Sequence, residues 1–222
     1  MNLITATSTT KDGSMYNRHD LCDPEVIKQR QAFLAGYGVA LEETVRLRVD
    51  YDTDDFCRYI EVGAADQGMG MTDDHATSSD ALITTTPGVA LFLPIADCIG
   101  ALIYDHTQHV LALAHLGRHS LEQQGGTKII QHLVGHYGCS VENLEVFLTP
   151  AAGKDNYKIW ALDNKGMKEA AHEQLRTAGL TPTQINDNDA DTTTNDLYYS
   201  YSQYLKGDRQ EDGDHAIFGV MR

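Results

Sequence analysis

The 222-residue sequence contains no long apolar run and few basic residues. No stretch approaches the roughly 18 consecutive apolar residues that a membrane-spanning helix needs. Lysine and arginine number 17 against 32 aspartates and glutamates, which gives a formal net charge of −15. Such an excess of negative charge repels phosphate backbones and anionic lipids, so we expect neither nucleic acid nor a membrane as a partner.

Cysteine is also scarce, and its spacing excludes a disulfide scaffold. Four cysteines lie far apart and form no Cys-x-x-Cys pair. A chain of this length can bury a sizeable core without covalent cross-links. The first residues show no basic stretch followed by an apolar core, as a secretory signal would. We therefore expect a cytoplasmic protein whose thiols are reduced.

Apolar periodicity and turn residues predict strands and helices that alternate irregularly along the chain. Asp23 followed by Pro24 is typical of a helix start. We expect helices over residues 24–36, 126–137 and 165–178. We expect strands within 1–20 and over 45–49, 59–62, 81–84, 89–95, 99–104, 110–114 and 144–148, with closing strands within 198–207 and 215–222. Without repeats or linkers, this pattern predicts a mixed α/β or α+β fold, with residues 1–222 as a single domain.

The segment IADCIGALIYDHTQHVLALAHLGRHS, residues 95–120, has two apolar runs around a short polar turn. If His106 and Thr107 form the turn of an antiparallel hairpin, paired positions sum to about 213, and Cys98 lies opposite His115. Their Cβ atoms would then be roughly 4.5–5.5 Å apart on one face. That distance lets the pair share a metal ion, or lets the histidine activate a thiolate. The alternative is a buried cysteine beside a hydrogen-bonded histidine with no chemical role.

The same block resembles a known family. SDALITTTPGVALFLPIADCIGALIYD is similar to the family's Asp-Ala and Ala-Asp-Cys core, and VLALAHLGRHS is similar to its Ala-His-Ala-Gly-Trp-Arg-Gly stretch. KDGSMYN and DTTTNDLYYSYSQY resemble its two terminal elements. This is the laccase-domain family, also described as multicopper polyphenol oxidase, purine nucleoside phosphorylase-type or peptidoglycan editing factor. The resemblance implies a single domain of layered mixed β-sheets flanked by helices, and a zinc enzyme that phosphorolyses or deaminates purine nucleosides.

The resemblance also implies a His/Cys/His metal site in which Cys98 and His115 are two ligands. The family's first histidine falls on Asp50, a residue type that can ligate zinc, and His75 is the alternative. Zinc would keep a fourth position for water and lower the pKa of that water towards about 7. Copper fits less well, because a laccase-type copper cluster needs many histidines and the sequence has no paired His-x-His stretch.

Nucleoside chemistry also needs a carboxylate that carries protons and cations that hold phosphate. Asp97 is the first choice for the carboxylate and Asp80 the second, although Asp97 and its neighbour Cys98 would face opposite sides of a regular strand. The available cations are Arg118, His119 and Lys11. The family's terminal Ser-Tyr-Arg arginine falls near Ser202. A nucleoside and phosphate are therefore the expected partners, and nothing in the sequence specifies an oligomeric state.

Two alternatives to a nucleoside enzyme stay open. The first is an amidase or other hydrolase that edits cell-wall precursors with Cys98 and His115 as a thiolate pair. The second is a binding protein that keeps the fold without catalysis. Two other segments resemble metal-binding motifs only weakly. His132 and His136 are spaced as a ligand pair but are not part of an HExxH motif. Residues 187–198 lack the glycine and the glutamate that a calcium-binding loop needs.

Overall fold

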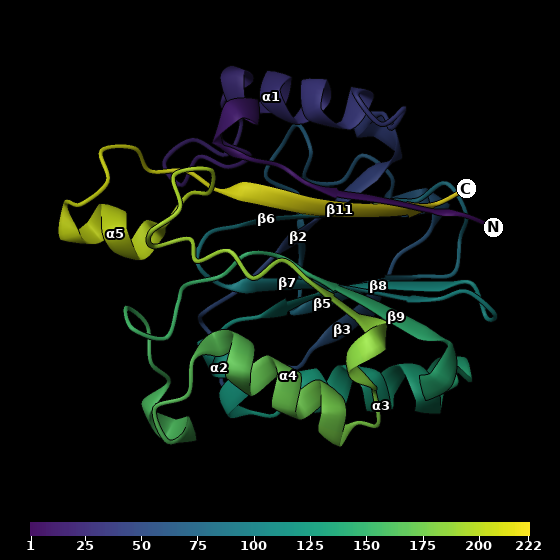
Figure 1. Ribbon diagram of the computed structural model, residues 1–222. Helices are drawn as coiled ribbons and strands as arrows, with labels where there is room; N and C mark the ends of the chain where they lie inside the picture. Colours follow the sequence, from purple (N-terminus) through teal and green to yellow (C-terminus); the bar gives the residue numbers. More distant parts are fainter.

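The structure is a computed structural model that describes residues 1–222, except for the side chain of Thr77. Two mixed β-sheets lie face to face in the middle of the molecule, and helices cover their outer faces (Figure 1). The first sheet has the strand order β1 (Leu3–Thr7), β11 (His215–Met221), β6 (Ala90–Ile95), β2 (Thr44–Arg48) and β4 (Thr77–Ser78). The second has the order β10 (Ile185–Asp187), β9 (Leu144–Leu148), β7 (Ile99–Asp105), β8 (Val110–Leu116), β5 (Ala81–Thr84) and β3 (Tyr59–Glu61).

Helix α1 (Pro24–Ala35) covers the outer face of the first sheet (Figure 1). It begins as expected, because Asp23 accepts a hydrogen bond from the backbone N–H of Glu25 at 2.9 Å. Its apolar face, with Phe33 and Leu34, packs against phenylalanines of β6 and β11. The mixed α/β architecture that the sequence predicts is therefore confirmed on this side of the molecule.

Three helices cover the other sheet: α2 (Arg118–Glu122), α3 (Gly125–Tyr137) and α4 (Met167–Thr177). The central strands β7 and β8 are thus covered on both faces, by the helices outside and by the first sheet inside. All their residues are buried. A strand covered on both faces is apolar throughout instead of alternating, which explains the two apolar runs of residues 95–120.

The register of the β7–β8 hairpin differs from the expected one by two residues. Gly100, and not Cys98, pairs with His115. The turn is longer than expected because Asp105 Oδ1 accepts hydrogen bonds from the backbone of Thr107 and Gln108, at 2.8 and 2.9 Å. A shift of two residues keeps every side chain on its expected face.

The expectation of a closing strand within residues 198–207 is wrong, because α5 (Tyr201–Lys206) is a helix. Ser200 caps it by accepting a hydrogen bond from the backbone N–H of Gln203, and Gly207 ends it with φ 80°. The Ser-x-x-Gln spacing is a helix-start signal that the partial alternation of tyrosines obscured.

None of the four cysteines is joined to another in a disulfide, and Cys139 is the one that is buried. Within the described residues, no helix combines the length and apolar character that crossing a membrane requires.

Candidate functional site

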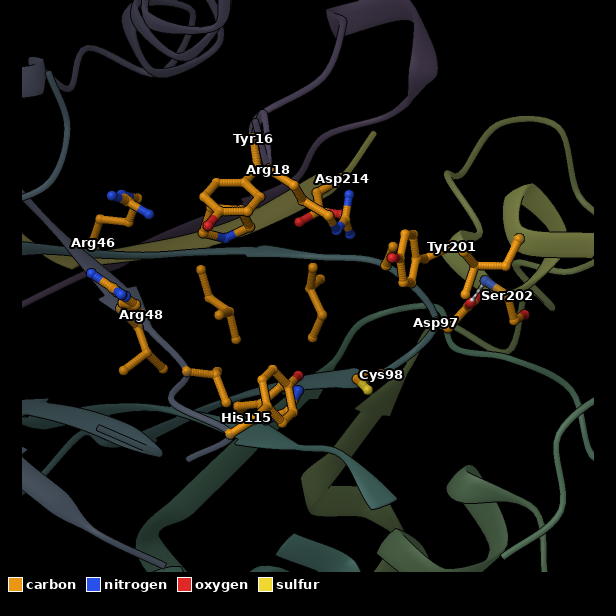
Figure 2. Close-up of a pocket in the computed structure, with 18 of the residues that line it drawn as sticks. Tyr16, Arg18, Arg46, Arg48, Asp97, Cys98, His115, Tyr201, Ser202 and Asp214 are labelled. Carbon is orange, nitrogen blue, oxygen red and sulfur yellow. Dashed lines mark hydrogen bonds and ion pairs between the residues drawn. The ribbon is translucent and has the colours of Figure 1, made fainter. Parts of the chain in front are cut away.

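A cavity of about 430 Å³ opens where the ends of β2, β6 and β8 meet the early loop and α5. Its volume lies in the range of small-molecule sites, roughly 300–1,000 Å³. Figure 2 shows arginines at one end, Cys98 and His115 along one wall, and Asp97 at the other end. Its polar and aromatic lining residues are Tyr16, Arg18, Arg46, Arg48, Tyr51, Asp97, Cys98, His115, Tyr157, Tyr201, Ser202 and Asp214.

Cys98 and His115 converge on Gly117, which follows β8. A Cβ atom at Gly117 would lie 3.2 Å from Cys98 Sγ and 3.0 Å from His115 Nε2. It would also lie 2.5 Å from His115 Cε1, which is closer than real side chains approach. Glycine at this position therefore leaves a space that both the thiol and the imidazole face, although the two residues are not the directly paired positions that the hairpin pattern predicted.

Burial favours the neutral form of both side chains. Burial and the nearby Asp97 raise the pKa of the Cys98 thiol to about 12, against a smaller lowering by the backbone N–H of Arg118. Burial lowers the pKa of His115 to about 4, although the nearby Asp80 opposes that shift. A protonated thiol is a weak nucleophile, so the raised pKa of Cys98 gives little support to a thiolate hydrolase.

Asp97 lies in a tight turn between β6 and β7. Its φ is +68°, and the N–H of Cys98 donates to the carbonyl of Ala96 at 2.8 Å across it. This is a γ-turn, a rare conformation for a residue other than glycine. Because the turn interrupts the strand, Asp97 and Cys98 both line the cavity. The objection that neighbouring strand residues face opposite sides does not apply here.

Both carboxylate oxygens of Asp97 already have donors. Oδ1 accepts from the hydroxyl of Thr192 and Oδ2 from the backbone N–H of Ser202, each at 2.7 Å. Asp97 thereby ties α5 and residues 191–194 to the end of the sheets. The second carboxylate choice, Asp80, is outside the cavity lining, and it is bound to Arg58 at 2.9 Å.

The residues expected to hold zinc supply two donors in one place. Cys98 and His115 meet, but the Asp50 carboxylate lies 3.9 Å from Arg58, and the 84% exposed His75 side chain lies 3.3 Å from Asp73. No group of three or more His, Cys, Asp or Glu side chains suited to a metal occurs in the described part of the chain. The residues therefore do not fit a three-ligand zinc site as they stand.

Two buried arginines at one end of the cavity have no carboxylate partner among the described residues. Arg46 is 1% exposed and donates to the carbonyl of Gly70, and Arg30, just behind it, is fully buried. Arg30 donates to the carbonyls of Met15 and Met71, and its Nη2 has no partner there. Burial and the charge of Arg46 lower the pKa of Arg30 to about 10. Buried unpaired cations are costly, so this end of the cavity favours an anion.

Arg18, in contrast, is shared by two acids. Its guanidinium nitrogens lie 2.5 Å from Asp212 and 2.6 Å from Asp214. The same group lies over the ring of Tyr201, with 4.1 Å from Cζ to the ring centroid. These ionic and aromatic contacts fix the position of Asp214 on the cavity wall (Figure 2).

The three cations expected to bind substrate, Arg118, His119 and Lys11, lie outside the cavity lining. Arg118 contacts His119, whose ring stacks on Phe56 at 4.6 Å. Their role in substrate binding stays a prediction. Sequence reasoning missed the arginines of the cavity, although Arg46 and Arg48 stand at alternate positions of a strand and therefore point the same way.

The fold and the site define an α/β protein with two stacked sheets and a small-molecule cavity beside a Cys/His pair. The chain belongs to the family described as multi-copper polyphenol oxidoreductase laccase, whose model matches residues 18–169. The resemblance seen in the sequence is thereby confirmed.

The curated relatives include proteins named for nucleoside chemistry. A purine nucleoside phosphorylase of Deinococcus radiodurans is 27% identical over 161 residues, which cover 71% of this chain and 54% of the relative. A protein named adenosine deaminase RL5, from an unknown prokaryotic organism, is 21% identical over 168 residues, 70% of this chain and 62% of that protein. This chain thus spans about half the length of the phosphorylase.

Solved structures show the same fold. The crystal structure of the Bacillus licheniformis hypothetical protein YfiH superposes with a TM-score of 0.84 at 19% identity, covering 99% of this chain and 93% of that one. YlmD from Geobacillus stearothermophilus also gives a TM-score of 0.84, at 20% identity, with 99% and 92% coverage. The layered architecture of mixed sheets and flanking helices is therefore shown for this chain.

Proposed function

We propose that this protein cleaves purine nucleosides by phosphorolysis in the cavity beside Cys98 and His115. The observation that carries the proposal is a small-molecule cavity with the buried, unpaired Arg46 beside Arg48 at one end and tyrosine rings along its walls. The relatives named purine nucleoside phosphorylase support the same substrate class.

The arginine end suits inorganic phosphate. Arg46 has no carboxylate partner among the described side chains, and Arg48 has only the half-exposed Asp74, at 3.3 Å. Guanidinium groups donate paired hydrogen bonds to phosphate oxygens, and a bound phosphate would neutralise the charge buried there. The same cations stabilise the charge that develops as phosphate attacks the sugar.

The tyrosine rings suit the nucleoside. Tyr16 lies next to the arginine end, with 5.6 Å between its ring centroid and Arg46 Cζ. The Tyr201 ring lies against the guanidinium of Arg18. The Tyr51 ring meets the His115 ring edge-on, with 6.4 Å between the ring centroids. A purine presents a flat π-face to such rings, and the neutral imidazole of His115 can exchange a hydrogen bond with a ribose hydroxyl.

Zinc stays a prediction in this proposal. Cys98 and His115 offer two donor atoms, and no third ligand lies beside them among the described residues. The proposed reaction therefore has no step that depends on the metal. When bound, zinc would supply a Lewis acid or a hydroxide.

Adenosine deamination is the second candidate, because one relative carries the name adenosine deaminase. Deamination needs an activated water that attacks the purine ring, whereas phosphorolysis needs the cations that line this cavity. Phosphorolysis therefore has the stronger geometric support. Hydrolysis of cell-wall precursors and non-catalytic binding have no comparable feature in the cavity.

A nucleoside panel with and without phosphate tests the proposal. Purified protein should convert inosine to hypoxanthine, and adenosine to adenine, only when phosphate is present. Conversion of adenosine to inosine and ammonia without phosphate would favour the deaminase. Intact nucleosides under every condition would refute an activity on purine nucleosides, and parallel reactions with a chelator would report any dependence on metal.

A further inference from the structure

We propose that Asp214 is the general acid of this site, which gives its proton to the purine as the base leaves. The inference rests on the proposed phosphorolysis and adds the residue that makes the base a better leaving group. Asp214 immediately precedes β11, and no sequence pattern pointed to it.

The position of Asp214 is fixed on every side but one. Its backbone N–H donates to the Ser14 hydroxyl at 3.1 Å, and its carbonyl accepts from the N–H of Met15 at 2.8 Å. Oδ1 accepts from Arg18 at 2.6 Å. Oδ2 accepts no hydrogen bond from the described residues, and the Asp214 side chain is 7% exposed. Because Asp214 lines the cavity, this free oxygen is available to a bound ligand.

Asp97 is the other buried carboxylate of the cavity, and it differs from Asp214 in that both of its oxygens accept hydrogen bonds. Thr192 and Ser202 already donate to its two oxygens. A ligand would have to compete with these two donors at Asp97, whereas Oδ2 of Asp214 accepts no hydrogen bond from the described residues. Of the two carboxylates, Asp214 is therefore the one with an oxygen free to meet a bound base.

The surrounding charges favour the protonated form of Asp214. One guanidinium, Arg18, is shared by two carboxylates, so the cluster has one negative charge in excess when both are ionised. Burial raises the pKa of Asp214 to about 6, with further raising by Asp212 and Asp97, against the lowering by Arg18. A general acid works best with a pKa near the operating pH.

Groups from every neighbouring segment act on this carboxyl. They are Arg18 of the early loop, Arg30 of α1, Tyr51 after β2, Asp97 and Cys98 of the turn before β7, Tyr199 before α5, and Asp212. The cations Arg18 and Arg30 favour the ionised form, and the two aspartates oppose it.

The proposed step exchanges one bond at C1′ for another and moves one proton. A phosphate oxygen forms a bond to C1′ of the ribose while the bond from C1′ to N9 of the purine breaks. The electron pair of that bond stays with the purine, and Asp214 transfers its proton to N7, so the base leaves neutral. The products are the purine and ribose 1-phosphate, and the Asp214 carboxylate regains a proton from solvent. No oxidant or reductant takes part.

A substrate that needs no proton tests this role. Inosine must be protonated to leave as a neutral base, whereas 7-methylinosine already has a positive imidazolium ring. Asp214→Asn should lower kcat/KM for inosine by about 10²–10⁴-fold, the usual contribution of acid catalysis, and for 7-methylinosine by less than about tenfold. In the wild type, kcat/KM for inosine relative to 7-methylinosine should fall as the pH rises through about 6.

Asp212→Asn is the matched control, because it also removes a carboxylate from Arg18 but lies outside the cavity lining. Because Asp212 helps to raise the pKa of Asp214, this variant should move the fall of the substrate ratio to lower pH, while below that pH it should keep the wild-type ratio that Asp214→Asn loses. Equal losses on both substrates in Asp214→Asn would overturn the acid role while leaving phosphorolysis intact. If that variant does not fold, a wild-type substrate ratio that is independent of pH would overturn it instead. Failure of the wild type to cleave either nucleoside would refute the proposed function itself.

Discussion

The expected zinc site depends on a single residue, Asp50, for its third ligand. Asp50 stands where the family resemblance places a histidine, yet its carboxylate lies 3.9 Å from Arg58 and is absent from the cavity lining. An ion pair with arginine satisfies the carboxylate where it is and leaves Cys98 and His115 without a third donor. Asp50 as a metal ligand therefore stays a prediction that this geometry does not favour.

Zinc binding by three single variants would show which of Asp50, Cys98 and His115 are ligands. If the native protein contains zinc, Asp50→Ala should retain the same amount per chain, whereas Cys98→Ala and His115→Ala should lose at least about tenfold in affinity, a typical effect of removing a partner at a metal site. Elemental analysis and zinc titration would measure this. A loss in Asp50→Ala as large as that in Cys98→Ala would restore Asp50 as a ligand.

Gly117 is the second residue on which the site depends. A methyl group there would lie 2.5 Å from His115 Cε1 and 3.2 Å from Cys98 Sγ. We expect Gly117→Ala to abolish activity by displacing these side chains, with an unfolding free energy lower by about 1–3 kcal/mol, as overpacking usually costs. Chemical denaturation together with the nucleoside assay would show it. Full activity in this variant would mean that the meeting of Cys98 and His115 is unimportant.

At the scale of elements, the turn between β6 and β7 connects the Cys/His pair to α5. Asp97 adopts a positive φ and binds the backbone at the start of α5 and the hydroxyl of Thr192. These contacts join segments about one hundred residues apart in the sequence. The turn thus places Cys98 and also fixes the far end of the cavity.

Removal of the Asp97 carboxylate should loosen that end. Hydrogen bonds to charged groups contribute about 1.5–3 kcal/mol each, so Asp97→Ala should lower the unfolding free energy by about 3 kcal/mol. Asp97→Asn should lose less, because asparagine tolerates positive φ and keeps one acceptor oxygen. Urea denaturation and hydrogen exchange of α5 would measure both. Equal losses in the two variants would contradict this account.

The sequence predicted elements better than it predicted their assembly. Local signals placed α1, the β7–β8 hairpin and β9, because caps, turn residues and apolar runs are short-range features. The face of Cys98 and His115 also followed, because an error of two residues in register preserves it. Helix α5 was missed, since its tyrosines alternate as strand residues do although Ser200 and Gly207 mark its ends.

The cavity itself could not be predicted, because packing across the whole chain creates it. Arg18 and Asp214 are 196 residues apart in the sequence and 2.6 Å apart in space. The buried pair Arg30 and Arg46 likewise depends on α1 covering the first sheet. A single sequence shows such residues only as isolated charges, which are normally exposed.

Asp214 should also make the unfolding free energy of the whole molecule depend on pH. Its folded pKa of about 6 is above the unfolded value of about 3.9. The folded state therefore binds more protons between these values, and the stability that Asp214 contributes is present below about pH 4 and is lost as the pH rises to about 6. The wild type should exceed Asp214→Asn in unfolding free energy by more at pH 4.5 than at pH 7. A difference that is constant, or larger at pH 7, would contradict the raised pKa.

The most direct test of the account is a ³¹P NMR time course of the purified protein with inosine and inorganic phosphate. We expect the phosphate signal to decline while a phosphate ester signal for ribose 1-phosphate grows in step with hypoxanthine. Arg46→Met should suppress that ester signal, because it removes the buried cation expected to bind phosphate. An unchanged phosphate signal, whether inosine stays intact or yields hypoxanthine and free ribose, would contradict the central claim that this cavity performs phosphorolysis.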